Sequence, residues 1–155
     1  MPDCIIKFVK YHPDAQLPTM GHEGDNCYDL YACVDAVVYP SLCNSVSCGV
    51  DVGCTLVPVG LKVGSISPGY GFVIRGRSGL AFKSGLMPHF GEIDNGYRGS
   101  IDIKVYNFTS QKHFVKKGDR IAQIKVEKNW NTRVEFTEEQ VDSSRGEGGF
   151  GSTGA

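Results

Sequence analysis

Long apolar runs are absent from this sequence of 155 residues, and none approaches the roughly 20 residues of a membrane-spanning helix. The start of the chain also lacks the basic and apolar regions of a signal peptide. The formal net charge is only -1, so no global field recruits nucleic acid or a membrane surface. We therefore expect a cytoplasmic or nuclear protein that binds neither nucleic acid nor membranes, and any anion site must be local.

Cysteine pairs with zinc-binding spacing are also missing. The six cysteines all fall between residues 4 and 54, and no Cys-x-x-Cys pair occurs among them. Without a secretory signal, reduced thiols, buried or at the surface, are the favoured interpretation. The alternative left open is an irregular metal site formed by His22, Cys27, Cys33 and Cys43.

A long helical periodicity is missing as well, whereas strand signals recur. Residues 100–108 alternate, with Ile101, Ile103 and Val105 on one face. Short helical turns are expected only at 77–83 and 137–139. At this length one domain is the default, and the pattern predicts an all-β fold. Further strands are expected within 4–10, 30–39, 54–67, 70–75, 120–127 and 132–136.

The stretch 91–99 gathers a carboxylate, an aromatic ring, a cation and three glycines between two strand signals. Its Asn95-Gly96 pair predicts a hairpin, because both central residues of a type I′ turn need positive φ. A hairpin tip would hold Asp94 and Tyr97 at a fixed separation. An ordinary surface turn is the alternative interpretation.

Two earlier stretches have chemistry suited to an anion. Arg77 can fork onto phosphate oxygens, the Ser78 hydroxyl can donate a hydrogen bond, and Gly79 lets backbone N–H groups come close. The plainer interpretation of this stretch is a helix start with Ser78 as its cap. Asp29 lies among apolar neighbours, so we expect it to be hydrogen-bonded or to sit beside a cation.

The glycine-rich tail has no large aliphatic residue and cannot pack alone. Its G-x-G-x-x-G pattern, from 146 to 151, predicts no dinucleotide loop, because no helix can follow before the chain ends. A disordered terminus is one expectation. The other is an arm that becomes ordered over a ligand, with Arg145 at an anion and Phe150 stacked on a flat group.

In this order the pieces resemble the homotrimeric dUTPase family (deoxyuridine triphosphate nucleotidohydrolases). Any single motif is weak evidence, but five in register along nearly the whole chain are specific. The opening stretch 12–18 is also similar to the family. The matching motifs are 28–32 (Tyr-Asp-Leu-Tyr-Ala), 77–81 (Arg-Ser-Gly-Leu-Ala), 91–99, 118–123 (Gly-Asp-Arg-Ile-Ala-Gln) and 145–154.

The resemblance implies a jelly-roll-like β-barrel in residues 1–141, with 41–53 as an atypical insertion. It implies a flexible glycine-rich arm in 142–155 that closes the active site. The family assembles as homotrimers with active sites at subunit interfaces. The implied activity is that of a dUTP diphosphatase, which hydrolyses dUTP to dUMP and pyrophosphate with Mg2+. This reaction limits uracil incorporation into DNA and supplies dUMP.

The resemblance also implies roles for individual residues. Asp94 would be the general base that deprotonates the attacking water. Tyr97 would lie against the deoxyribose, and backbone groups including those of Ile93 would pair with the uracil edge. Asp29 would contact Mg2+ through water, in the outer shell, because the phosphates themselves bind the metal. The other implied substrate contacts are Arg77, Ser78, Gly79, Gln123, Arg145, Phe150, Gly151, Ser152 and Thr153.

The chain departs from the family pattern at several positions. Asn26-Cys27 replace Ala-Gly, Gly76 replaces Pro, and 88–90 (Pro-His-Phe) with Glu92 replace smaller residues before the Ile93-Asp94 pair. Together with the segment 41–53, these departures indicate a divergent member of the family. A virus-encoded protein is one interpretation of that divergence. One alternative hypothesis is a dUTPase-fold nucleotide-binding or regulatory protein with weak catalysis. Another is a deoxycytidine triphosphate deaminase with Glu92 as its base.

Overall fold

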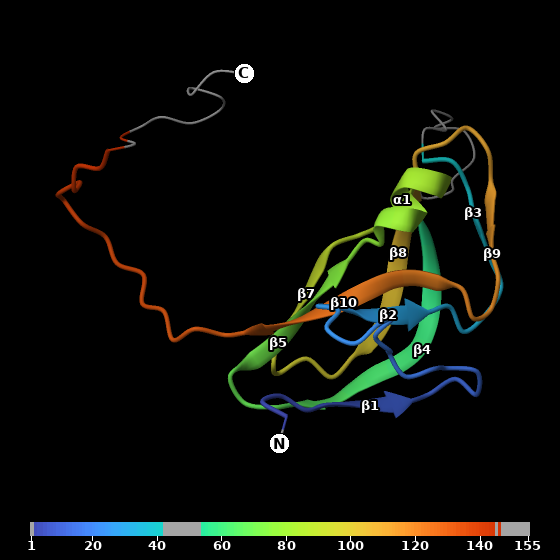
Figure 1. Cartoon of the computed structure of the whole chain (residues 1–155), viewed down its shortest axis with the longest axis horizontal. Helices are drawn as coiled ribbons and strands as arrows, with labels where there is room; N and C mark the ends of the chain where they lie inside the picture. Colours follow the sequence, from blue (N-terminus) through green and yellow to red (C-terminus); the bar gives the residue numbers. More distant parts are fainter. Residues whose placement is uncertain (1, 42–53, 145, 147–155) are drawn as a thin grey trace.

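The computed structural model describes residues 2–41, 54–144 and 146. Within these ranges the chain forms ten strands and one short helix (Figure 1). In chain order the elements are β1 (Ile6–Lys10), β2 (Tyr28–Tyr31), β3 (Ala36–Val38), β4 (Thr55–Ile66), β5 (Tyr70–Arg75), α1 (Ser78–Ser84), β6 (Leu86–Pro88), β7 (Gly91–Ile93), β8 (Ser100–Asn107), β9 (His113–Val115) and β10 (Arg120–Lys128).

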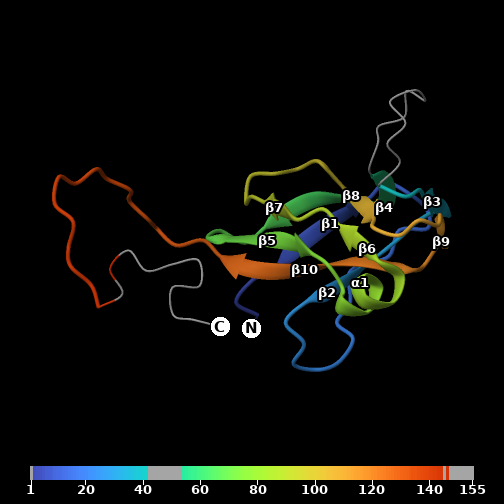
Figure 2. The same ribbon diagram turned by 90° about the horizontal axis from the view of Figure 1, so that it is seen from above.

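Two four-stranded antiparallel sheets enclose the core, as Figures 1 and 2 show. One sheet has the strand order β1-β4-β8-β6 and the other β2-β10-β5-β7, while β3 and β9 form a separate pair. The rings of Phe8 on β1 and Phe72 on β5 meet across the core with centroids 6.1 Å apart. This arrangement confirms the predicted all-β, jelly-roll-like fold.

Strand β8 shows how the alternation in the sequence builds this core. Ile101, Ile103 and Val105 are at most 3% exposed, as their spacing predicted. At the end of the same face Asn107 is fully buried, and its side-chain amide donates to the carbonyls of Val38 and Gln111 at 3.0 and 2.8 Å. A buried polar group must be paired in this way. β8 is therefore anchored by packing along its length and by hydrogen bonds at its end.

The predicted hairpin at Asn95-Gly96 is wrong. β7 pairs with β5, whereas β8 pairs with β4 and β6, so residues 94–99 cross between the two sheets. Gly96 is not among the glycines with positive φ in the described chain. Instead, the Asn95 side-chain amide donates to the carbonyls of Ile66, Ser67 and Tyr70 at 3.3, 2.8 and 2.9 Å. These tertiary bonds, rather than the local turn propensity, decide the path of the chain.

The expected last strand, 132–136, and the helical turn at 137–139 are also wrong. After β10 the chain runs away from the two sheets without regular structure as far as residue 144 (Figure 1). Val134 and Phe136 are almost completely exposed. A strand needs a neighbouring strand for its backbone hydrogen bonds, and the described part of this chain supplies none here. No helix in the described ranges is long and apolar enough to cross a membrane.

Two smaller differences concern element ends. β1 begins at Ile6 rather than at residue 4. The helix at 78–84 has Arg77, not Ser78, as its N-cap, and no side chain caps it. Arg77 has an extended backbone conformation (φ −98°, ψ 127°) and lies just outside the helix.

Candidate active site

Asp29 is the buried acid at the centre of the site. It lies on β2, and only 8% of the residue is exposed. Its backbone N–H donates to the Thr19 carbonyl at 2.7 Å, and the Thr19 N–H donates back at 3.4 Å. On the other side, β2 pairs with β10 in a register that places Asp29 opposite Gln123. The carboxylate is therefore held in place by backbone bonds on both sides of its strand.

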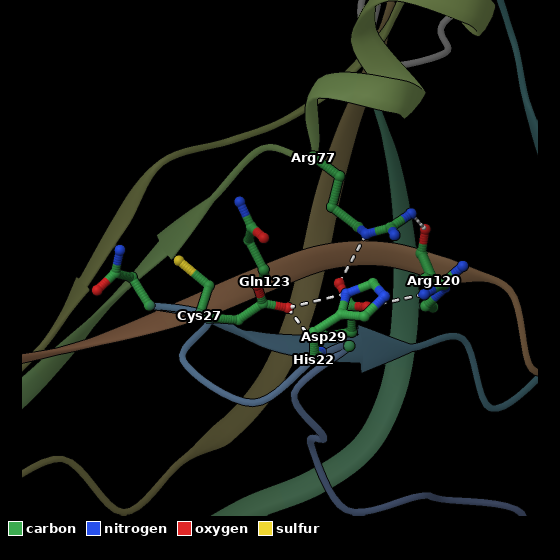
Figure 3. A pocket seen from close by; sticks show the side chains of 9 residues that line it. His22, Cys27, Asp29, Arg77, Arg120 and Gln123 are labelled. Atoms are coloured by element: carbon green, nitrogen blue, oxygen red, sulfur yellow. Dashed lines mark hydrogen bonds and ion pairs between the residues drawn. The ribbon is translucent and has the colours of Figure 1, made fainter.

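Two arginines bind this carboxylate. Arg77 Nε donates to Oδ1 of Asp29 at 2.7 Å, and Arg120 Nη1 donates to Oδ2 at 3.2 Å. Figure 3 shows Arg77 reaching down from the start of α1, while Arg120 comes from the beginning of β10. Arg77 Nη1 also donates to the Arg120 carbonyl at 3.4 Å. Asp29 sits beside cations, as expected, and it orients both guanidinium groups at the pocket.

Gln123 supports the same cluster through the backbone next to Arg77. Its Nε2 donates to the carbonyl of Gly76 at 2.7 Å, which fixes the chain just before Arg77. Ser78 and Gly79 follow at the start of α1 but are not among the residues that line the pocket. A Cβ built on Gly79 would meet no heavy atom within 4 Å, so that surface is open to an approaching group.

These groups line an open pocket of about 290 Å³. Three of the stretches singled out in the sequence, 28–32, 77–81 and 118–123, each contribute at least one side chain to it. Two arginines and two aspartates give the lining balanced formal charge, with donor-rich guanidinium groups at its surface. Guanidinium forks bind phosphate oxygens in a bidentate manner. The pocket therefore suits a phosphorylated ligand. Its lining is Gly21, His22, Asp25, Asn26, Cys27, Asp29, Arg77, Arg120 and Gln123.

The donor set does not form a metal cage. Among the described residues, no group of three or more His, Cys, Asp or Glu side chains could hold a metal ion. Cys43, part of the irregular site considered from the sequence, lies outside the described residues. Mg2+ is commonly bound through one or two carboxylates together with substrate phosphates. One buried carboxylate beside a pocket whose guanidinium groups suit phosphate oxygens fits that mode.

Asp94 lies elsewhere, in the turn that follows β7. Its carbonyl accepts a hydrogen bond from the Tyr97 N–H at 3.0 Å, and Asn95 ties the turn to the carbonyl of Tyr70. Tyr70 and Arg75 are the two ends of β5, which at about 3.3 Å per residue are roughly 17 Å apart. Arg77 follows the far end. Within one chain, the expected base and the arginine pocket are therefore at opposite ends of a strand.

Tyr97 stands beside this turn and is 40% exposed. Its hydroxyl donates to the carbonyl of Ser100 at 2.9 Å, so the ring lies across Gly99. Arg98 closes the turn by donating to the carbonyls of Asn95 and Tyr97 at 2.7 and 2.6 Å. Tyr97 and Ile93, like Asp94, are not among the residues that line the pocket.

The sequence motifs did not identify Arg120 as a partner of Asp29, nor Asn95 as the residue that fixes the turn around Asp94. Arg120 belongs to the motif 118–123, but its partner Asp29 is 91 residues away in sequence. From the sequence, Asn95 indicates only a turn. Five other expected substrate contacts lie outside the described residues, namely Arg145, Phe150, Gly151, Ser152 and Thr153.

Two shifted pKa values are found away from the pocket. Burial, together with the hydrogen bond to Asp102, raises the pKa of Tyr11 to about 12. Burial raises the pKa of the Cys33 thiol. Cys4, Cys27, Cys33 and Cys54 are all free thiols. Of these groups, Cys27 alone is among the residues that line the pocket.

Comparison with known proteins gives a consistent result over nearly the whole chain. The dUTPase family model matches residues 13–154. The deoxyuridine 5'-triphosphate nucleotidohydrolase of Helicobacter pylori (strain J99) is 40% identical over 153 residues, which cover 96% of each chain. The protein of the same name from Paramecium bursaria Chlorella virus 1 is 40% identical over 154 residues, 99% of each chain.

Solved structures agree on the fold. A variant of the Staphylococcus bacteriophage 80alpha dUTPase with dUpNHpp matches with a TM-score of 0.80 at 24% identity, covering 97% of this chain and 99% of that one. A dUTPase variant from phage phi11 of S. aureus matches with a TM-score of 0.74 at 20% identity, covering 89% and 99%. The family model and the sequence relatives together show that the chain belongs to the dUTPase family.

Proposed function

We propose that this protein is a dUTP diphosphatase, which hydrolyses dUTP to dUMP and pyrophosphate. The observation that carries the proposal is the convergence of three family motifs, distant in sequence, on one arginine-lined pocket. Relatives that are 40% identical over almost the full chain are named for this reaction. The reaction would limit uracil incorporation into DNA and supply dUMP, and the expected cytoplasmic or nuclear location stays a prediction.

The pocket would bind the triphosphate. Arg77 and Arg120 offer charged donors that are already oriented by Asp29, so little reorganisation is needed when negative charge develops. Ser78 and Gly79 adjoin Arg77 on an open surface and would add a hydroxyl and backbone N–H groups. Gln123 would act mainly by holding the Gly76 carbonyl and thereby the position of Arg77.

Mg2+ is the cofactor that fits this donor set. Asp29 would face its hydration shell through water, since both carboxylate oxygens keep a lone pair beyond the arginine bonds. When bound by the phosphates, the ion would neutralise part of their charge. A structure of the phage phi11 dUTPase describes the coordination of a structural Mg(II) ion in that protein.

Asp94 would supply the base and Tyr97 the sugar contact. A carboxylate within hydrogen-bond reach of a water can accept its proton as the water attacks phosphorus. Tyr97, fixed by its bond to the Ser100 carbonyl, would exclude a 2′-hydroxyl. Backbone groups of 91–99, including those of Ile93, would form hydrogen bonds with the uracil edge. Cytosine has the inverted donor and acceptor pattern, so with it these backbone groups would stay unpaired. Asn95 would hold this whole turn in place.

A second copy of the chain would complete the site, which supports the proposed homotrimer. Asp94 lies near one end of β5 and Arg77 follows the other end, a separation that supports a site shared between two chains. The segment after β10 also leaves four large apolar side chains exposed, namely Trp130, Val134, Phe136 and Val141.

An apolar pocket of about 320 Å³ lies between β1, β2 and β10 and could receive such side chains from a partner. Ile5 and Leu17 at its rim are more than half exposed. We keep the division into a barrel, 1–141, and an arm, 142–155, as part of the proposal. The arm would bring Arg145 and Phe150 to the terminal phosphate and the uracil ring, with Gly151, Ser152 and Thr153 at the phosphates.

A nucleotide panel tests the function. We expect Mg2+-dependent pyrophosphate release from dUTP and little from dTTP, dCTP or UTP. Asp94→Asn should bind dUTP but lose most turnover, because the amide cannot accept the proton. Truncation after Ser144 should lower turnover and leave the barrel folded. Equal release from dUTP and dCTP, or unchanged turnover in Asp94→Asn, would overturn the proposal.

A further inference from the structure

His22 is a pocket residue that neither the motifs nor the proposed roles account for. It lines the pocket with Arg77 and Arg120, in the loop that leads into β2. The loop is fixed at its base by the Thr19–Asp29 backbone bonds. At its tip, the His22 N–H donates to Asp25 Oδ2 at 2.8 Å, and the Asp25 N–H donates to the His22 carbonyl at 3.2 Å. The backbone of His22 is thus closed into a small ring.

The imidazole itself is open to solvent and within reach of a ligand in the pocket. Its side chain is 90% exposed, and the nearest charged partner is Asp25 Oδ2, 3.7 Å from Nδ1. The ring belongs to the same pocket lining as Asp29, Arg77 and Arg120, which Figure 3 labels together. A fixed backbone with an exposed donor ring at the mouth of a pocket is suited to contact a ligand rather than to support the fold.

Charge explains what this ring would add. Arg77 and Arg120 are balanced in formal charge by Asp25 and Asp29, so the described lining is close to neutral when His22 is neutral. A triphosphate brings several negative charges into this space. A protonated imidazole would add one positive charge to this lining and would donate hydrogen bonds from both ring nitrogens.

We propose that His22 is a further substrate-binding residue, which contacts a phosphate oxygen at the open rim of the pocket and binds it more tightly when the imidazole is protonated. This inference rests on the proposed function. The charged groups that face His22 are Asp25 on its own loop, Asp29 on β2, Arg77 before α1 and Arg120 on β10, with Glu23 next to it in the sequence. The bound phosphates would outweigh the two arginines and favour the charged ring.

The test compares pH profiles of substrate affinity. KM for dUTP and the Kd of the analogue dUpNHpp are measured from about pH 5.5 to about pH 8.5, in the wild type and in His22→Gln. Because a phosphate group itself titrates near pH 6, the measured quantity is the ratio of the two proteins. We expect His22→Gln to bind roughly two- to fivefold more weakly near pH 6, as for an exposed ion pair, and equally well near pH 8.5, with kcat unchanged.

Two further variants separate a direct contact from a structural effect. His22→Lys keeps its charge, so its affinity should stay high across the range and lose its pH dependence. His113→Gln, on β9 and away from the pocket, should follow the wild type. A ratio between wild type and His22→Gln that does not change with pH would overturn the role of His22. Absence of dUTP hydrolysis in the wild type would instead overturn the proposed function.

Discussion

Replacing Asp29 by Asn tests whether this carboxylate holds the arginine cluster together. The amide has nearly the same size, but it keeps one acceptor and turns an NH2 group toward the second guanidinium. The bond from Arg77 is 2.7 Å long and the Arg77 side chain is 24% exposed. The bond from Arg120 is 3.2 Å long and the Arg120 side chain is 50% exposed. The loss of folding stability should therefore come mainly from the broken bond to Arg77.

The magnitude follows from this partial burial. Breaking a fully buried pair costs about 3–5 kcal/mol, and an exposed pair contributes about 0.2–1 kcal/mol. Asp29 is buried but both arginines reach solvent, so we expect a loss of about 1–3 kcal/mol. For a domain of this size that is a fall in Tm of roughly 2–12 °C.

Thermal and urea unfolding at a fixed protein concentration measure this effect, since assembly would shift the apparent stability. Arg77→Gln should cost more than Arg120→Gln, and Asp3→Asn, an exposed carboxylate on the N-terminal stretch, is the matched control. All three pocket variants should weaken dUTP binding. An Asp29→Asn protein that melts with the wild type, or a larger loss for Arg120→Gln than for Arg77→Gln, would refute the reasoning.

Three other predictions use the same structure. Asn95→Ala removes three hydrogen bonds from the turn beside the expected base, so kcat/KM should fall about ten- to a hundredfold, as a small misplacement can cause; steady-state kinetics within twofold of the wild type would contradict this. Gly60→Ala should destabilise more than Gly69→Ala in chemical unfolding: both glycines have positive φ, but a Cβ on Gly60 would stand 2.6 Å from the His12 Cβ and a Cβ on Gly69 meets nothing within 4 Å. The folded-state pKa of Tyr11 is raised, so its contribution to stability is complete below about pH 10 and is lost as pH rises toward about 12; in Tyr11→Phe this loss should disappear from urea unfolding curves, and an identical loss in both proteins would argue against it.

Local pattern predicted those elements whose burial has a simple period. β8 alternates because one face meets the core, and β5 was predicted with its observed ends, 70–75. The turn at 68–69 also follows from local chemistry, since Gly69 has φ 78° and the Tyr70 N–H donates to the Ser67 carbonyl.

The errors arise where distant partners decide. The Asn95-Gly96 pair predicts a hairpin. In the structure, the Asn95 side-chain amide instead donates hydrogen bonds to three carbonyls about 25 to 29 residues earlier in the chain. Val134 and Phe136 have the spacing of a strand but no strand beside them in the described chain. The site shows the same division: the motifs located Arg77, Asp29 and Gln123, while no local signal showed that Arg120, within the same motif as Gln123, binds Asp29, or that His22 lines the pocket.

The length of β5 separates Asp94 from Arg77 within one chain. This separation affects how two defective variants behave when they are mixed and how activity depends on protein concentration. If each reaction centre draws its base from one polypeptide and its cations from another, two defective gene products can repair each other. Mixed assemblies of Asp94→Asn and Arg77→Gln chains would contain some centres with both groups intact, although either variant alone has none. By the same reasoning, a chain that is isolated by dilution would turn over nothing.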